Sequence, residues 1–343
     1  MEIKTRVIEV LDGQDYNQIT LVNDHGVEAS FLTLGATWQT FLVPDGKGGQ
    51  KDLVLGFATP SDYLKSGMAA GQSVGRVAGR ISQGHAEISG LSYQLPTNNN
   101  GNTLHGGPGG LHLQNWDFET LEAPDRVGVV FTYQARQELD GFPGDMTVTA
   151  TYTLDNANQL TVTYKGAEAT EDTLFNPTNH VYFNLSNGQD LATHRFTVAA
   201  DAILAVDEFL IPSGQYCDVT DTPYDFRAGA PLVPAIEATG GIDDTFLVNS
   251  RADEPIAVLL DEASGDQVSI FSDRNALVVY SLNFPDDQAY FNRDHGKPGT
   301  KHEGVALEAQ FPPDAINHPE FADIVLPKGQ ERTYTISYAY EKI

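Results

Sequence analysis

The chain has 343 residues, enough to bury a sizeable core in one large all-β domain or in two smaller domains. Its 47 acidic and 20 basic side chains give a formal net charge of −27, which repels phosphate backbones and anionic lipids, so we expect no nucleic acid and no membrane as a partner. Cys217 is the only cysteine, which excludes an intrachain disulfide and a cysteine metal cluster and favours a reducing compartment.

In chain order, the first segment, Met1 to Arg6, lacks the apolar run of a secretion signal, and no apolar stretch is long enough to span a bilayer. We therefore expect a cytoplasmic protein. Helical periodicity is scarce, and only Ser61 to Lys65 is predicted as a turn or two of helix.

Arg76 and Arg80 follow in a segment punctuated by glycines. Either could reach a polar ligand, and a salt bridge is the alternative for both in so acidic a chain.

The polar patch Asn98 to Asn102 predicts a loop that leads into His105. Gly106 and Gly107 follow the histidine and would let the backbone and a ligand approach each other closely. A surface histidine with a local hydrogen bond is the alternative interpretation. Taken alone, this segment does not decide between them.

Period-two alternation of apolar and polar residues recurs later in the chain and predicts strands. It occurs at 129–133, in both halves of 147–164, and at 334–340, and the turn residues 155–158 make the middle segment a hairpin. The 32 glycines and 18 prolines separate many short apolar runs, which favours turns between strands over alternating strands and helices. We predict an all-β fold, a large antiparallel β-sandwich, with residues 1–343 as a single domain because no linker divides the chain.

Two later segments place ionisable side chains among apolar ones. His180 precedes Val181 to Phe183, so we expect it to begin a strand and to face a wet cleft or, alternatively, a packed core. Glu308 lies between Val305 to Leu307 and Phe311, where an unpaired carboxylate is costly. Burial would raise its pKa and make it a stronger base, and a structural ion pair is the competing explanation.

If folding brings His105, His180 and Glu308 together, they form an acid/base set. An imidazole titrates near pH ~6.5 and a carboxylate near ~4.3, so one group can hold a proton while the other accepts one. This combination predicts an enzyme that moves protons on a neutral substrate.

Other features give weaker signals. Asp243 could accept hydrogen bonds from sugar hydroxyls, although a plain turn is favoured for a Gly-Asp segment. Aromatic residues such as Tyr280 and Phe284 could stack on a sugar, although most aromatics in a sandwich are core. The chain has no paired-histidine metal motif, no Gly-x-Ser-x-Gly elbow and no glycine-rich phosphate loop.

Taken in order, short motifs over most of the chain resemble the aldose 1-epimerases, the galactose mutarotase family. Each motif is weak alone, and their shared order from about residue 18 to the end is specific. The motifs are Leu34-Gly35-Ala36, Asp52 to Phe57, Ala78 to Ile81, Thr103 to Gly107, Gly141 to Gly144, Asn176 to His180, Asp225 to Arg227, Gly241 to Asp243 and Leu307-Glu308.

The resemblance implies a mutarotase-like β-sandwich with an open cleft for a small aldose sugar, and it implies no cofactor and no metal. The implied activity interconverts the α and β anomers of free aldoses such as glucose and galactose, with maltose as a further candidate. A monomer or a homodimer is expected.

The resemblance also assigns roles. Glu308 matches the catalytic base that takes the anomeric proton, and His180 matches the acid that protonates the ring oxygen. His105 matches a second histidine near that oxygen, while Arg80 and Asp243 match residues that hold sugar hydroxyls.

Tyr280 falls where relatives line the site with side chains. Two positions depart from the family pattern: Gly79 stands where many members carry asparagine, and Asp244 where many carry histidine. Both departures concern sugar preference and not the chemistry.

Three alternative functions remain open at this point. A glycoside hydrolase would need two carboxylates, for which Glu308 and Asp243 are the available pair. A hexose-phosphate epimerase would need clustered basic groups. A carbohydrate-binding module would use the cleft without turnover. For a disaccharide, residues 285–303 are predicted to decide access of the second sugar unit.

Overall fold

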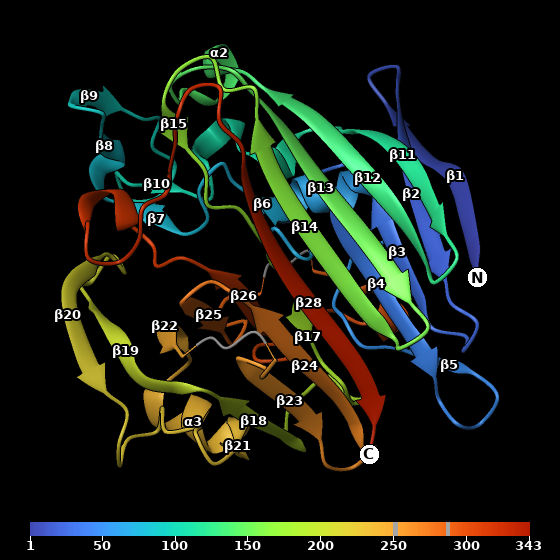
Figure 1. Cartoon of the computed structure of the whole chain (residues 1–343). Helices are drawn as coiled ribbons and strands as arrows, with labels where there is room; N and C mark the ends of the chain where they lie inside the picture. The colour runs from blue at the N-terminus through green and yellow to red at the C-terminus, as the bar shows by residue number, and fades with distance from the viewer. Residues whose placement is uncertain (250–252, 286–288) are drawn as a thin grey trace.

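The computed structural model describes residues 1–249, 253–285 and 289–343 and contains three large antiparallel sheets (Figure 1). Every pairing between named strands in this part of the chain is antiparallel, which confirms the predicted fold class. The predicted hairpin at 147–164 is confirmed as two adjacent strands whose alternate side chains are buried. The patterns at 129–133 and 334–340 are also confirmed as strands.

The largest sheet has nine strands and joins distant parts of the chain. The last strand of the chain, β28, lies between β14 and β24, so the C-terminal segment holds the two halves of this sheet together (Figure 1). In spatial order the strands are β11 (Asp117–Ala123), β12 (Arg126–Ala135), β13 (Met146–Asp155), β14 (Gln159–Ala167), β28 (Arg332–Lys342), β24 (Asp266–Ser272), β23 (Ala257–Asp261), β18 (His194–Val198) and β21 (Ala230–Pro231).

A five-stranded sheet packs on one face of the nine-stranded sheet through aromatic side chains. Phe31 lies 4.5 Å from Tyr152 between ring centroids, and Trp38 lies 5.0 Å from Tyr338. These rings are fully buried, and burial of such large apolar surfaces is the main force that holds two sheets together. The strands follow chain order: β1 (Glu2–Leu11), β2 (Gln14–Val22), β3 (Glu28–Leu32), β4 (Thr37–Pro44) and β5 (Gln50–Asp52).

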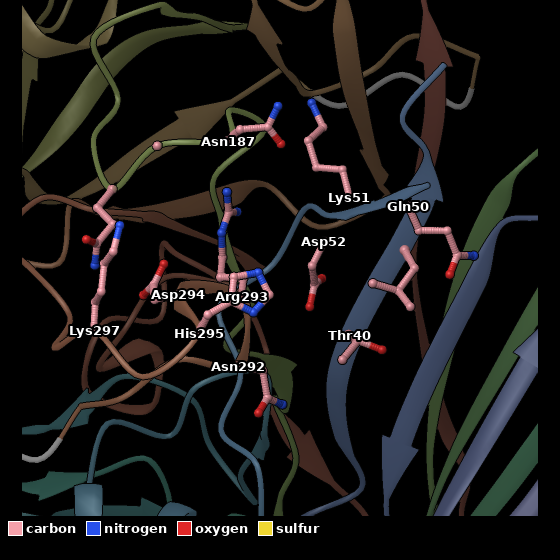
Figure 2. A pocket seen from close by; sticks show the side chains of 13 residues that line it. Thr40, Gln50, Lys51, Asp52, Asn187, Asn292, Arg293, Asp294, His295 and Lys297 are labelled. Carbon is pink, nitrogen blue, oxygen red and sulfur yellow. The ribbon is translucent and has the colours of Figure 1, made fainter. Parts of the chain in front are cut away.

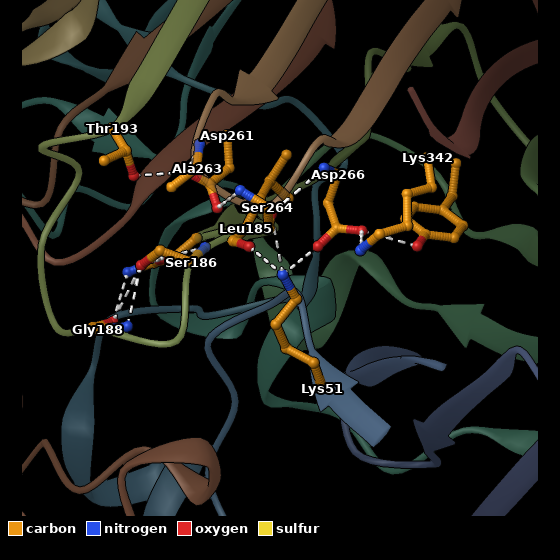
Figure 3. Close-up of polar contacts among 12 residues, drawn as sticks. Lys51, Leu185, Ser186, Gly188, Thr193, Asp261, Ala263, Ser264, Asp266 and Lys342 are labelled. Atoms are coloured by element: carbon orange, nitrogen blue, oxygen red, sulfur yellow. Dashed lines mark hydrogen bonds and ion pairs between the residues drawn. The ribbon is translucent and has the colours of Figure 1, made fainter. Parts of the chain in front are cut away.

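A buried ion pair also connects these two sheets. The Lys51 ammonium of β5 donates to Asp266 of β24, to the Leu185 carbonyl oxygen at 2.6 Å and to Ser264 Oγ at 3.3 Å (Figure 3). Asp266 accepts a further hydrogen bond from Tyr340 at 2.9 Å. Both charges are buried and partnered, as buried charges in proteins need to be.

The third sheet has six strands, and it positions the site described below. Phe246 of β22 contacts Phe226 with ring centroids 6.1 Å apart, and Phe226 contacts Phe196 of β18 at 5.2 Å, so this sheet shares the core of the nine-stranded one. Its strands are β17 (Tyr182–Phe183), β26 (Val305–Gln310), β25 (Ala276–Tyr280), β22 (Asp243–Val248), β19 (Ala200–Val206) and β20 (Pro212–Asp218).

The remaining elements are short. The predicted helical turn at 61–65 is confirmed as α1, which Thr59 caps and Gly67 ends in the left-handed conformation. The paired strands are β6 (Ser73–Val74) with β16 (Thr178–Asn179), β7 (Arg80–Ile81) with β10 (Thr103–Leu104), β8 (His85–Ile88) with β9 (Leu91–Gln94), and β15 (Thr173–Leu174) with β27 (Val325–Leu326). The helices are α1 (Pro60–Ser66), α2 (Gln137–Asp140), α3 (Leu232–Thr239) and the 3-10 turns η1 (Ser82–Gly84), η2 (Gly107–Gly109), η3 (Leu111–Leu113), η4 (Asn292–Asp294) and η5 (Ala315–Asn317). None of the helices in the described ranges has the length and apolar character that crossing a bilayer requires.

Candidate active site

A cavity of about 390 Å³ lies against one face of the six-stranded sheet. Three neighbouring strands each contribute two alternate residues to its wall, because side chains two positions apart on a strand share a face. The register places Glu308 opposite Val278, and Tyr280 opposite Asp243, so these side chains lie side by side. The six residues are Asp243 and Thr245 of β22, Val278 and Tyr280 of β25, and Glu308 and Gln310 of β26.

His180 lies directly beside Glu308 in the wall of this cavity. It lies between β16 and β17 and does not begin a strand, a small difference from the prediction. Its Nε2 atom is 3.3 Å from Oε1 of Glu308, and the two residues are only 6% and 2% exposed. The chain therefore brings together a carboxyl and an imidazole from segments 128 positions apart, the difference between 308 and 180.

Arg80 and His105 form another part of the wall. Arg80 of β7 pairs with Leu104 of β10, and the His105 backbone N–H donates to the Gly79 carbonyl oxygen at 3.0 Å. The His105 ring lies 5.2 Å from the His180 ring in an edge-to-face arrangement. Gly106 permits this geometry, because a Cβ there would lie 1.7 Å from the Gly75 carbonyl oxygen.

Burial shifts the two facing groups in opposite directions. It raises the pKa of Glu308 to about 8, with Asp243 adding to the rise and Arg80 opposing it. It lowers the pKa of His180 to about 4. Each shift favours the uncharged form, because a charge loses its hydration in a buried site.

At neutral pH the two pKa shifts together favour one proton on the pair, carried by Glu308. From the sequence we expected an ionised Glu308 beside a protonated His180, whereas these pKa shifts favour the proton on Glu308. The expected and the favoured states of the pair hold the same number of protons. They differ only in which atom carries the proton, Glu308 Oε1 or His180 Nε2, and these atoms are 3.3 Å apart. Glu308 Oε2 and His180 Nδ1 are buried without a hydrogen-bond partner.

The other residues predicted for the site also line the cavity. Burial raises the pKa of Asp243 to about 6, while Arg80 acts to lower it, so Asp243 is still an acceptor at neutral pH. Asp243 is the first residue of β22 and not part of a plain turn as favoured from sequence. The Tyr280 hydroxyl accepts a hydrogen bond from the Phe284 backbone N–H at 3.2 Å.

His105, His180 and Glu308 lie close enough together to be compared with a metal site. Each offers one ligand atom, these atoms lie within 4.8 Å of one another, and two imidazoles with a carboxylate can bind zinc or iron. However, the Gly79 N–H donates to His105 Nδ1 at 3.2 Å, so the neutral ring carries its hydrogen on Nε2. A metal-bound histidine instead donates from its second nitrogen. Neither nitrogen of His105 has a free lone pair, because Nδ1 accepts a hydrogen bond and Nε2 carries the hydrogen, so this donor set does not fit a metal.

Three positions near the cavity make contacts within the protein. Arg76 is buried and donates twice to Asp140, at 2.7 and 3.0 Å, so of its two interpretations the salt bridge is the one observed. Asp244 hydrogen-bonds Tyr224 and is not part of the cavity wall. An asparagine at position 79 would bring its Cβ to 2.9 Å from Pro313, so the glycine is matched to that proline.

Sequence reasoning missed Thr245 and Gln310 as wall residues. Both lie two positions after a residue that it found, Asp243 and Glu308, and the period of a strand could have identified them. Gln310 is fully buried, and its side-chain oxygen has no hydrogen-bond partner.

A separate polar hollow of about 570 Å³ lies beside β5 (Figure 2). Asn292 to His295 and Lys297 line it together with Lys51 and Asp52. The sequence associated residues 285–303 with access to a second sugar, but none of the described residues from 289 to 303 lines the cavity at Glu308. Residues 286–288 of that stretch lie outside the described residues.

The family model described as aldose 1-epimerase matches residues 17–339. The chain is 45% identical to an aldose 1-epimerase from Streptococcus thermophilus, covering 99% of both proteins. It is 37% identical to a maltose epimerase from Levilactobacillus brevis over the full length of both, and 35% identical to a galactose mutarotase from Rattus norvegicus over 92% of this chain and 91% of the relative.

Solved structures agree with these relatives. An aldose epimerase homologue from C. elegans superposes with a TM-score of 0.87 at 31% identity, covering 94% of this chain and 98% of that one. A galactose 1-epimerase from Lactobacillus acidophilus gives a TM-score of 0.85 at 28% identity, covering 99% of both chains. This chain belongs to the aldose 1-epimerase family.

Proposed function

We propose that this enzyme interconverts the anomers of a free aldose in the cavity at Glu308, with Glu308 and His180 as its acid and base. The aldose 1-epimerase activity follows from the family, and the residue roles are our proposal. The observation that carries the roles is the 3.3 Å approach of His180 Nε2 to Glu308 Oε1 inside a cavity that suits a small sugar.

The reaction needs one proton removed and one proton supplied. The anomeric O–H loses its proton to the Glu308 carboxylate while the ring oxygen gains a proton from His180, and the C1–O5 bond breaks to give the open-chain aldehyde. Rotation about C1–C2 exposes the other carbonyl face, and reclosure returns both protons. No proton is consumed in the cycle.

The protonation that these pKa shifts favour matches one state of this cycle. A protonated Glu308 beside a neutral His180 is the form that ring opening leaves behind, so the resting pair is complementary to the open-chain sugar. A cyclic sugar reacts when the shared proton has moved to His180. The positive charge of Arg80 favours this transfer, because it lowers the pKa of Glu308.

The other wall residues would orient the sugar. His105 lines the cavity, and its neutral ring carries a hydrogen on Nε2 that would donate to a sugar oxygen near the ring oxygen. Arg80 would donate to hydroxyls and Asp243 would accept from them. Tyr280 would form a flat wall against the ring.

Two alternatives are less consistent with the cavity. Arg80 is the only lysine or arginine among the described wall residues, which is too little positive charge for a phosphate dianion. A glycoside hydrolase would use two carboxylates across an open groove, whereas here an imidazole faces the glutamate. A module that only binds sugars has no need of an acid/base pair.

Polarimetry tests this function directly. Freshly dissolved α-D-glucose and α-D-galactose should reach their equilibrium rotations faster with the protein than without it, and maltose is the next candidate because a relative is a maltose epimerase. His180→Asn should keep its fold and lose about 10²- to 10⁴-fold in rate, the typical contribution of one proton-transfer group. A variant as fast as the wild type would remove His180 from the mechanism.

We also propose that residues 1–343 act as a single cytoplasmic domain, as a monomer or a homodimer, with neither nucleic acid nor membrane as a partner. The support for one domain is that β7, β17 and β26, from distant parts of the chain, line the same cavity. The net charge of −27 and the single cysteine support the remaining points.

A further inference from the structure

We propose that Phe284 forms an outer subsite at the mouth of the cavity, where it stacks on the second sugar unit of a reducing disaccharide joined through O4. This inference rests on the proposed function and names the side chain that would hold the second unit of a disaccharide substrate. Phe284 is 82% exposed, the largest exposed fraction among the large apolar side chains in the described part of the chain, and it lines the cavity.

The chemistry of the ring fixes which end of the sugar faces outward. C1 and the ring oxygen must approach Glu308 and His180, which are the buried part of the cavity at 2% and 6% exposure. In a six-membered aldose ring, C4 lies directly opposite C1. A substituent on O4 therefore points away from the acid/base pair and towards solvent.

The size of the cavity places a second unit outside it. At about 390 Å³ the cavity is at the small end of the ~300–1,000 Å³ found for small-molecule sites, which suits one hexose. The mouth, where exposed side chains begin, is the part that an O4-linked unit would contact.

Aromatic side chains connect the interior of the cavity to its mouth. His180 lies 5.0 Å from Tyr182 between ring centroids, and Tyr182 lies 6.1 Å from Tyr280. The Tyr280 hydroxyl in turn accepts the 3.2 Å hydrogen bond from the backbone N–H of Phe284. This bond fixes the backbone of Phe284 beside the wall that would hold the first sugar.

Folding gives no reason for a phenylalanine in this position. A buried phenylalanine contributes about 1.5–3 kcal/mol through burial, and a ring that is 82% exposed obtains little of this. Phe284 lines the cavity, and its flat ring suits the apolar face of a pyranose.

The test compares glucose and maltose as substrates of Phe284→Ala. We expect kcat/KM for maltose to fall about 2- to 12-fold, the range of an aromatic contact, while kcat/KM for glucose changes less than twofold. Phe284→Trp should retain maltose activity because it keeps a flat ring. Tyr216→Ala is the matched control: Tyr216 is 52% exposed and does not line the cavity, so neither substrate should be affected.

The outcomes separate this inference from the proposed function. A wild-type protein that acts on glucose but not on maltose, or a Phe284→Ala variant that changes both substrates equally or neither, overturns the outer subsite and leaves the epimerase mechanism intact. A wild-type protein inactive on both sugars would instead contradict the proposed function.

Discussion

Two buried carboxylates in this molecule behave in opposite ways. Asp266 is fully buried between two sheets, and burial raises its pKa, but hydrogen bonds from Lys51, Ser264, Tyr340 and Lys342 outweigh burial and leave the pKa below its ordinary value (Figure 3). Glu308 is 2% exposed, and its pKa is raised to about 8. Burial is common to both, so the difference lies in the partners.

The comparison separates a structural charge from a reactive one. Asp266 is surrounded by donors and stays ionised, and its charge stabilises the contact between β5 and β24. Glu308 has one oxygen near a neutral imidazole and one with no partner, so it can exchange a proton with a ligand. A buried carboxyl with unused hydrogen-bonding capacity inside a cavity is therefore the more informative signal of function.

The sharpest test of this difference is Glu308→Gln. We expect a loss of about 10²- to 10⁴-fold in the catalysed mutarotation rate, because the amide cannot exchange a proton at this position. The fold should be unaffected or more stable, because the raised pKa means that ionising Glu308 costs free energy in the folded state. Polarimetry and thermal unfolding at pH 7 measure the two effects.

Glu303→Gln is the matched control for that variant. Glu303 is also fully buried, and its pKa is likewise raised to about 8, by burial and by Asp294, but it does not line the cavity. It should keep the wild-type rate. Equal losses in the two glutamine variants would show that disturbing a buried carboxyl, and not removing a catalytic group, causes the defect.

Lys51→Met tests the other half of the comparison. Removing the ammonium leaves Asp266 with fewer donors in a buried place, which typically costs ~3–5 kcal/mol of the free energy of unfolding. Denaturant unfolding measures the loss, and the protein that remains folded should keep its specific activity. Lys342→Met should cost less, because the Lys342 side chain is 47% exposed. If Lys342→Met lost more free energy of unfolding than Lys51→Met, then Lys342 and not Lys51 would be the main partner of Asp266.

Changing the pH near neutrality should have the smallest effect on the catalytic rate. The pair holds one proton between the lowered pKa of His180, about 4, and the raised pKa of Glu308, about 8. Below this window His180 gains a second proton and no base remains, and above it Glu308 loses the shared proton and no acid remains. Initial rates should therefore follow a bell-shaped curve of kcat/KM. Rates that keep rising above pH 9 would contradict the shared proton.

Much of the fold could be predicted from local pattern. The alternation at 147–164 predicted a hairpin because a strand exposes alternate side chains on opposite faces, and the structure has β13 and β14 there. The position of β28 between β14 and β24 could not be predicted, because strand partners distant in sequence carry no local signal.

For the site, the residue types found from sequence, Arg80, His105, His180, Asp243, Tyr280 and Glu308, all line one cavity. Residues 285–303 were predicted to control access of a second sugar unit, and five of their described residues, Asn292 to His295 and Lys297, line the hollow beside Lys51. Loops carry no periodic pattern that fixes the direction in which they fold back.

The sequence by itself determined the strand-rich architecture, the family and the chemical groups available for proton transfer, because these depend on residue types and on short-range periodicity. Only the tertiary structure decided where the shared proton resides, which buried carboxyl is held by donors, and which aromatic ring stands at the mouth of the cavity. Desolvation and hydrogen bonding depend on what surrounds an atom in space, and those neighbours come from the whole length of the chain.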